Sequence, residues 1–211
     1  MTSETSEVKV WDLAVRIFHW SLASLFFFSY FTGDDDSTLH VYSGYAIIGL
    51  IAFRAIWGII GTRYARFNNF IYGLDKTKEY TLSLLKFHPK HYIGHNPLGG
   101  WMIFALLISL SLTSWSGLEA YGSKGYGPLA TSTELNRQQS FISNAFADDD
   151  EAHDAERHEH DGDEFWEEVH EFFANFTLFL VIVHLAGVLV SSLLHGENLI
   201  QAMITGRKKQ P

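Results

Sequence analysis

The chain has 211 residues, 47% of them hydrophobic and 15% aromatic, and its formal net charge is −9. A nucleic-acid-binding protein presents a basic face to the phosphates, so the acidic balance argues against that class. The absence of cysteine excludes disulfides, thiolate-bound zinc, iron–sulfur clusters and haem attached through a CxxCH motif. Any metal must therefore be held by histidine, methionine or carboxylate, and the chain has eleven histidines.

The N-terminal segment MTSETSEVKVWD is polar and carries two acidic residues before its first lysine. A cleavable signal peptide has a basic start, an apolar core and small residues at the cleavage site. That pattern is missing here. We therefore expect the first apolar segment to stay in the mature protein.

Four apolar segments are long enough to cross a bilayer, which takes about 20 residues in a helix. The expected spans are residues 13–32, 40–61, 98–117 and 172–194. A soluble protein with buried helices is the alternative, but four segments of full bilayer length argue against it. The sequence predicts an all-α fold: an integral membrane four-helix bundle, up-down-up-down, forming a single domain over residues 1–211.

Charges alternate between the connections. Basic residues lie in the N-terminal segment, in the connection 62–97 and in the C-terminal tail, whereas the two other connections carry eighteen acidic and three basic residues. The positive-inside rule then predicts that both termini are cytoplasmic and that the acidic loop 118–168 is periplasmic. The expected location is the bacterial inner membrane, with several spans in contact with lipid.

Two histidines are expected near each face of the membrane. His19 and His184 lie toward the cytoplasmic side, and His40 and His170 toward the outer side. His170 and His184 are fourteen residues apart, which in a helix is a rise of about 21 Å and about 40° from whole turns. Both imidazoles therefore share one face of the fourth span, and polar groups in a span face the bundle interior.

Two pairs of histidines matched in depth predict two haem b groups. A six-coordinate haem takes an imidazole on each side of the ring, and facing helices of a bundle can supply them. His19 with His184 would ligate an inner haem, and His40 with His170 an outer one. A single histidine in a span is as often structural as ligating, but four in matched pairs are harder to explain that way. His195 competes with His184, although it lies beyond the apolar segment.

Other residues of the spans are consistent with a bound cofactor. Arg16 precedes His19 by one helical turn and is either a propionate partner or an ordinary positive-inside anchor. Arg54 lies fourteen residues after His40, and a propionate partner is the preferred explanation for an arginine within a span. Gly44 and Gly187 either serve close helix packing or make room for a porphyrin.

Five segments together resemble the bacterial membrane-bound di-haem cytochrome b family. They are VWDLAVRIFHW at 10–20, LHVYSGYAIIGLIAFRAIWGIIG at 39–61, GHNPLGG at 94–100, the pair His170 and His184, and NLIQAMITGRKK at 198–209. The family includes cytochrome b subunits of nickel–iron hydrogenases, relatives in formate dehydrogenases and small stand-alone b cytochromes. The resemblance covers the chain except residues 118–165.

This resemblance implies four helices, two b haems and electron exchange between the quinone pool and a periplasmic partner. Its ligand positions correspond to His19, His40, His170 and His184. The quinone would be ubiquinone or menaquinone. His95, in the basic connection before the third span, is a candidate contact for the quinone or for a haem propionate.

The segment 118–168 departs from the family pattern. Its second half, ADDDEAHDAERHEHDGDEFWEE, is densely acidic and contains His153, His158 and His160. It is interpreted first as a solvated, partly disordered segment. It is alternatively a docking surface for a basic periplasmic redox protein such as a c-type cytochrome, or a divalent-metal site.

The leading hypothesis is transmembrane electron transfer between quinone and a periplasmic redox protein, with quinol-oxidising or quinone-reducing activity. A superoxide:quinone oxidoreductase is the second hypothesis, although an acidic outer face would repel the superoxide anion. A metal or proton transporter that uses the same histidines is the third. Each of these hypotheses is compatible with a homo-oligomer.

Overall fold

The computed structural model describes residues 7–33, 37–86, 92, 94–130 and 149–209. Asp34, Asp35 and Asp36 and residues 131–148 of the acidic loop lie outside the described part. The side chains of 149–163, which include His153, His158 and His160, are not described either, so the metal-site interpretation of that segment stays a prediction.

Four long helices dominate the described chain: α1 (Leu13–Phe31), α2 (Thr38–Ile60), α4 (Pro97–Ser123) and α6 (Asp149–His195). Each contains a segment long and apolar enough to cross a membrane, which in α6 lies within Glu164–His195. Large apolar side chains on them are exposed, among them Phe31 at 77% and Leu193 at 82%. Such surfaces are stable against lipid, so the fold is the predicted all-α membrane helical bundle.

Two of these helices extend beyond the expected spans. α4 continues from the expected end at residue 117 to Ser123, and α6 begins at Asp149 although the expected span begins at 172. Hydropathy marks only the apolar part of a helix. The acidic stretch before it contains no proline and several strong helix formers, so the polar part of α6 continues the same helix.

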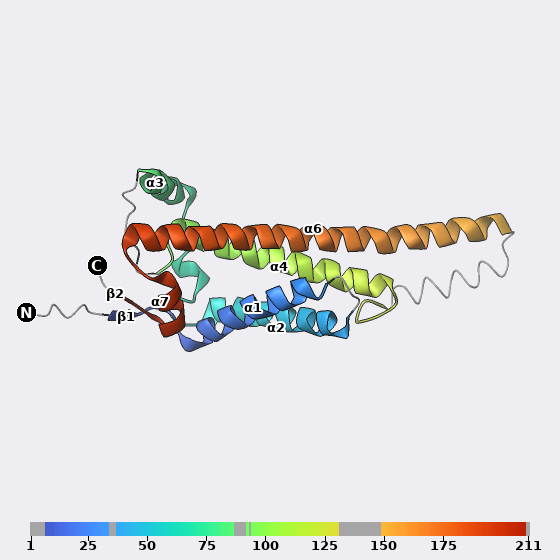
Figure 1. The fold of residues 1–211 in the computed structure, drawn as a ribbon, viewed down its shortest axis with the longest axis horizontal. Helices are drawn as coiled ribbons and strands as arrows, with labels where there is room; N and C mark the ends of the chain where they lie inside the picture. Colours follow the sequence, from blue (N-terminus) through green and yellow to red (C-terminus); the bar gives the residue numbers. More distant parts are fainter. Residues whose placement is uncertain (1–6, 34–36, 87–91, 93, 131–148, 210–211) are drawn as a thin grey trace, which may run out of the picture. The chain divides into compact units, whose positions relative to one another are not determined.

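The described chain divides into two compact units, residues 1–108 with 178–211 and residues 109–177. In the first unit, α1 and α2 lie side by side (Figure 1), and Phe18 contacts Phe53 at a ring-centroid distance of 6.3 Å. Each helix begins at a side-chain cap that satisfies a free backbone N–H group. Val15 N donates to Asp12 Oδ1 at 2.8 Å, and His40 N donates to Ser37 Oγ at 3.2 Å.

The two ends of the described chain meet in the first unit. β1 (Glu7–Lys9) pairs antiparallel with β2 (Arg207–Lys209), and Figure 1 shows both beside α7 (Leu199–Thr205). α7 ends at Gly206, whose φ of 81° is the left-handed conformation that glycine adopts without strain. The connection between α2 and α4 contains η1 (Phe67–Asn69) and α3 (Leu74–Leu85).

In the second unit, buried hydroxyl groups connect α4 and α6. Thr177 Oγ1 lies 2.6 Å from Ser109 Oγ and 3.0 Å from Thr113 Oγ1. Thr177 is 0% and Ser109 2% exposed, so each hydroxyl requires the other as a partner. Lys124, just after α4, pairs with Glu167 of α6 at 2.8 Å.

Candidate functional site

The structure brings His19 of α1 and His184 of α6 together within the first unit. Their ring centroids are 6.5 Å apart and both side chains are half-buried. Two imidazoles that share one metal ion at metal–nitrogen distances of about 2.0 Å have centroids about 6 Å apart. The observed separation is therefore compatible with both imidazoles binding one metal ion.

Several buried side-chain polar atoms of the first unit have no hydrogen-bond partner in the described part of the chain. They are Arg16 Nε, His19 Nδ1, Arg54 Nη1, Tyr80 Oη and His95 Nδ1. Buried donors of this kind are costly unless a bound group accepts from them. The two guanidinium nitrogens among these atoms can only donate, and they fit a bound group that carries carboxylates.

Arg54 is 4% exposed although it is charged. Its Nη2 donates to the carbonyl of Ala65 at 3.1 Å, and its guanidinium lies over the Phe67 ring at 4.5 Å from the centroid. These contacts hold the side chain at the end of α2 next to the following loop. Arg16 donates from Nη2 to the carbonyl of Ile204, which ties α1 to α7.

His95 lies between two aromatic rings. Its ring centroid is 4.4 Å from that of Trp11 and 4.6 Å from that of Phe70. Burial, together with the positive charges of Arg54 and Lys208, lowers the pKa of His95 to about 3. The imidazole is therefore neutral near pH 7 and can act as a hydrogen-bonding group.

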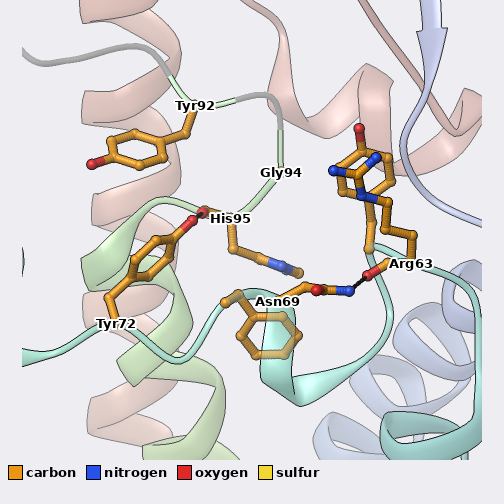
Figure 2. Close-up of a pocket in the computed structure, with 8 residues that line it drawn as sticks. Arg63, Asn69, Tyr72, Tyr92, Gly94 and His95 are labelled. Atoms are coloured by element: carbon orange, nitrogen blue, oxygen red, sulfur yellow. Dashed lines mark hydrogen bonds between the residues drawn. The ribbon is translucent and has the colours of Figure 1, made fainter.

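His95 also lines a pocket of about 170 Å³, drawn in Figure 2. The Tyr72 hydroxyl donates to the carbonyl of His95 at 3.2 Å, which fixes the backbone at the pocket. Four of its eight lining residues are tyrosine or phenylalanine, and an arginine, an amide and an imidazole are among its polar groups. Its lining residues are Arg63, Tyr64, Asn69, Phe70, Tyr72, Tyr92, Gly94 and His95.

Only His95 of this pocket was predicted from the sequence. Tyr72 and Tyr92 pack against each other at a centroid distance of 5.7 Å although twenty residues separate them in the chain. The connection 62–97 contains many aromatic residues. This was the feature of the sequence that could have indicated a pocket with aromatic walls.

The Nδ1 atom of His40 lies 3.0 Å from the carbonyl of Ser29 and 3.3 Å from the Ser29 hydroxyl. Histidines that ligate metals commonly donate their second ring N–H to a carbonyl, which fixes the tautomer and the ring orientation. With Nδ1 engaged in this way, Nε2 is the nitrogen that would face a metal.

His170 has the same arrangement in the second unit. Its Nδ1 atom lies 2.9 Å from the carbonyl of Thr113 and 3.3 Å from Ser116 Oγ. His40 belongs to the first unit and His170 to the second, so the predicted pairing of these two histidines stays a prediction.

His195, the competing ligand, has its Nδ1 atom 2.9 Å from the carbonyl of Ser191, one turn earlier on α6. This is an intrahelical contact near the C-terminus of α6. A Cβ atom added at Gly44 or Gly187 would meet nothing within 4 Å, so open space adjoins both positions.

Among the described side chains, no group of three or more His, Asp or Glu residues is placed to hold a metal ion. A haem iron takes only two protein ligands, so a pair such as His19 and His184 is sufficient for it.

A family model described as prokaryotic cytochrome b561 matches residues 10–206 of the chain. No curated protein and no solved structure gives a significant match.

Proposed function

The chain belongs to the prokaryotic cytochrome b561 family, and from this premise we propose that it transfers electrons across the bacterial inner membrane through two b haems. Transmembrane electron transfer by b-type haem is the activity of the family, and the four apolar helices make the chain a multi-pass membrane protein. The proposed electron partners are ubiquinone or menaquinone and a periplasmic redox protein such as a c-type cytochrome.

The single observation that carries the proposal is the proximity of His19 to His184. Their 6.5 Å centroid distance suits one iron, and they come from helices far apart in the sequence. When bound, haem supplies an iron that accepts and releases one electron. His19 and His184 would hold that iron, and the apolar helices that carry them would keep water away from it.

Arg16 and Arg54 are proposed to bind the propionates of the inner haem. Each has one buried guanidinium nitrogen without a hydrogen-bond partner in the described chain, and each is held by a backbone carbonyl through another nitrogen. A guanidinium that one carbonyl holds in place, and that has another N–H group without a partner, is well suited to bind a carboxylate.

His40 and His170 are proposed as the ligands of the outer haem. In support, each imidazole donates from Nδ1 to a main-chain carbonyl of another helix, which fixes the orientation of its ring, whereas the His195 ring contacts a carbonyl of its own helix. They also have the depth that the sequence pattern assigns to the outer side of the membrane.

The pocket at His95 is the proposed site for the quinone ring. Aromatic walls suit a planar ring, and the neutral imidazole can donate to or accept from a quinone oxygen. We expect His95→Ala to slow the reduction of haem by quinol while dithionite still reduces both haems. An unchanged quinol reaction would exclude His95 from the site.

The acidic segment 118–168 is proposed to attract the periplasmic partner, because its charge is complementary to that of a basic c-type cytochrome. Electron exchange with such a cytochrome should slow as ionic strength rises. Fast reduction of the haems by superoxide at any ionic strength would favour the superoxide:quinone oxidoreductase instead.

The decisive experiment measures haem in the purified protein. We expect a dithionite-reduced b-type absorption spectrum with two haems per chain. His184→Ala and His170→Ala should each lose one haem, while the matched control His195→Ala on the same helix keeps both. A colourless wild-type protein would refute the proposal and favour a metal or proton transporter.

A further inference from the structure

We propose that Ser116 and Gly117 of α4 are positioning residues that orient the imidazole of His170 for coordination. This inference rests on the proposed function, in which His170 ligates a haem iron. It concerns only the second unit, where all the relevant atoms lie.

Ser116, Thr113 and His170 form one hydrogen-bond cluster. The Ser116 hydroxyl donates to the carbonyl of Thr113 at 3.0 Å, and His170 Nδ1 lies 2.9 Å from that same carbonyl and 3.3 Å from Ser116 Oγ. The carbonyl can only accept, so the proton of the neutral imidazole is on Nδ1. This selects the tautomer in which Nε2 can bind a metal.

The His170 ring closely approaches Gly117. A Cβ atom added at Gly117 would lie 2.8 Å from Cε1 and 3.0 Å from Nδ1 of His170. Glycine within a helix costs about 1 kcal/mol relative to alanine. The contact explains why this position has no side chain: any larger residue would push the imidazole away from its hydrogen bonds.

Buried contacts hold this part of α4 against α6. Thr113, whose carbonyl accepts from His170, places its own hydroxyl 3.0 Å from Thr177 Oγ1. Thr177 lies seven residues after His170 on α6, about two turns along the same face. The fully buried Thr177 therefore holds Thr113 in the position where its carbonyl accepts from His170.

The experiment uses the full chain purified with its haems, in the variants Gly117→Ala and Ser116→Ala. Gly117→Ala should displace the imidazole, so that one haem is lost or becomes able to bind carbon monoxide, which a haem with two histidine ligands does not do. Gly49→Ala is the matched control, because a Cβ atom there meets nothing within 4 Å.

Ser116→Ala keeps the Thr113 carbonyl and should fold. The variant removes the hydroxyl oxygen that lies 3.3 Å from His170 Nδ1. The imidazole then gives less electron density to the iron, and this disfavours the oxidised form. We expect the reduction equilibrium of one haem to shift about tenfold toward the reduced form, about 59 mV for a one-electron couple. Ser123→Ala is the control, since that hydroxyl donates to the Ala120 carbonyl at 3.0 Å near the end of α4.

Two results overturn the inference in distinguishable ways. Wild-type protein with two haems, together with variants whose haem content, carbon monoxide binding and potentials equal those of the controls, rejects the role of Ser116 and Gly117 alone. Wild-type protein without haem rejects the proposed function and this inference with it.

Discussion

Arg54 illustrates how single residues in this protein combine burial with unused hydrogen-bonding capacity. It is 4% exposed, has one guanidinium nitrogen bonded to a carbonyl and has another without a partner in the described chain. A charge buried this deeply requires compensation. The Asp12 carboxylate interacts with it electrostatically, and the haem propionate proposed above would supply a second negative charge.

A substitution tests this interpretation. Arg54→Gln should lower the midpoint potential of one haem, because a nearby positive charge stabilises the form that has gained an electron. A change of about tenfold in the reduction equilibrium corresponds to about 59 mV. Redox titration measures it, and Arg66→Gln, at an exposed arginine in the next loop, should leave both potentials unchanged.

Gly44 and Gly49 provide a matched pair on α2. Both adjoin open space, but Gly44 is four residues after His40 and on its face, whereas Gly49 is nine residues after it and on the opposite face. Gly44→Leu should therefore reduce haem content from two to about one per chain, and Gly49→Leu should not. Equal haem content in both variants would mean that Gly44 serves helix packing.

The histidine ligands could be proposed from the sequence, but their partners could not. The depth of a residue in the membrane and its angular position on a helix follow from its place within a span. These two quantities allowed His19 and His184 to be predicted as a pair. The carbonyls of Ser29 and Thr113 come from neighbouring helices. Which carbonyl faces a given imidazole depends on helix rotation, and hydropathy does not determine that.

At the scale of elements, Asp12 joins the start of α1 to the end of α2. Its carboxylate accepts from Val15 N at 2.8 Å, from Trp57 Nε1 at 3.2 Å and from the Thr62 hydroxyl. Burial acts to raise the pKa of Asp12, but the bonds from Thr62, Val15 and Trp57 prevail and lower it. The ionised form is thus favoured in the folded protein.

The sign of the pH effect follows from that direction. A carboxyl group whose pKa is lower when folded stabilises the fold above its unfolded pKa of about 3.9, and the contribution is lost as pH falls through the folded value. Asp12→Asn keeps a capping side chain but loses the charge, and should destabilise the protein by about 1 kcal/mol at pH 7. Thermal unfolding in detergent should show the difference from wild type shrinking below about pH 4. A constant difference would contradict the role of the charge.

The four apolar helices were predictable because each carries its own signal of length and hydropathy. The pairing of β1 with β2 was not, since it joins Glu7 to Lys209 across nearly the whole chain. The ion pair of buried Lys208 with Glu197 at 3.0 Å fixes this arrangement, yet in the sequence Lys208 is only one of several basic tail residues. Long-range contacts of this kind leave no periodic pattern.

For the whole molecule, the distribution of charge predicts one orientation in the membrane. An alkaline phosphatase domain fused after residue 211 should be inactive, and a fluorescent protein at the same position should fluoresce, because the basic tail stays in the cytoplasm. Phosphatase inserted at residue 140, within the acidic loop, should be active. The reverse pattern of activities would invert the assignment of inner and outer histidines.

The length of α6 limits how a soluble partner can approach. From Asp149 to His170 the helix rises about 32 Å, since each residue adds 1.5 Å. A protein bound only at the Asp149 end of α6 would lie farther from His170 than the thickness of the membrane's hydrocarbon core, about 30 Å. For the docking role proposed above, the partner's redox centre would have to lie near His170, so the partner would contact α6 along its length between Asp149 and His170.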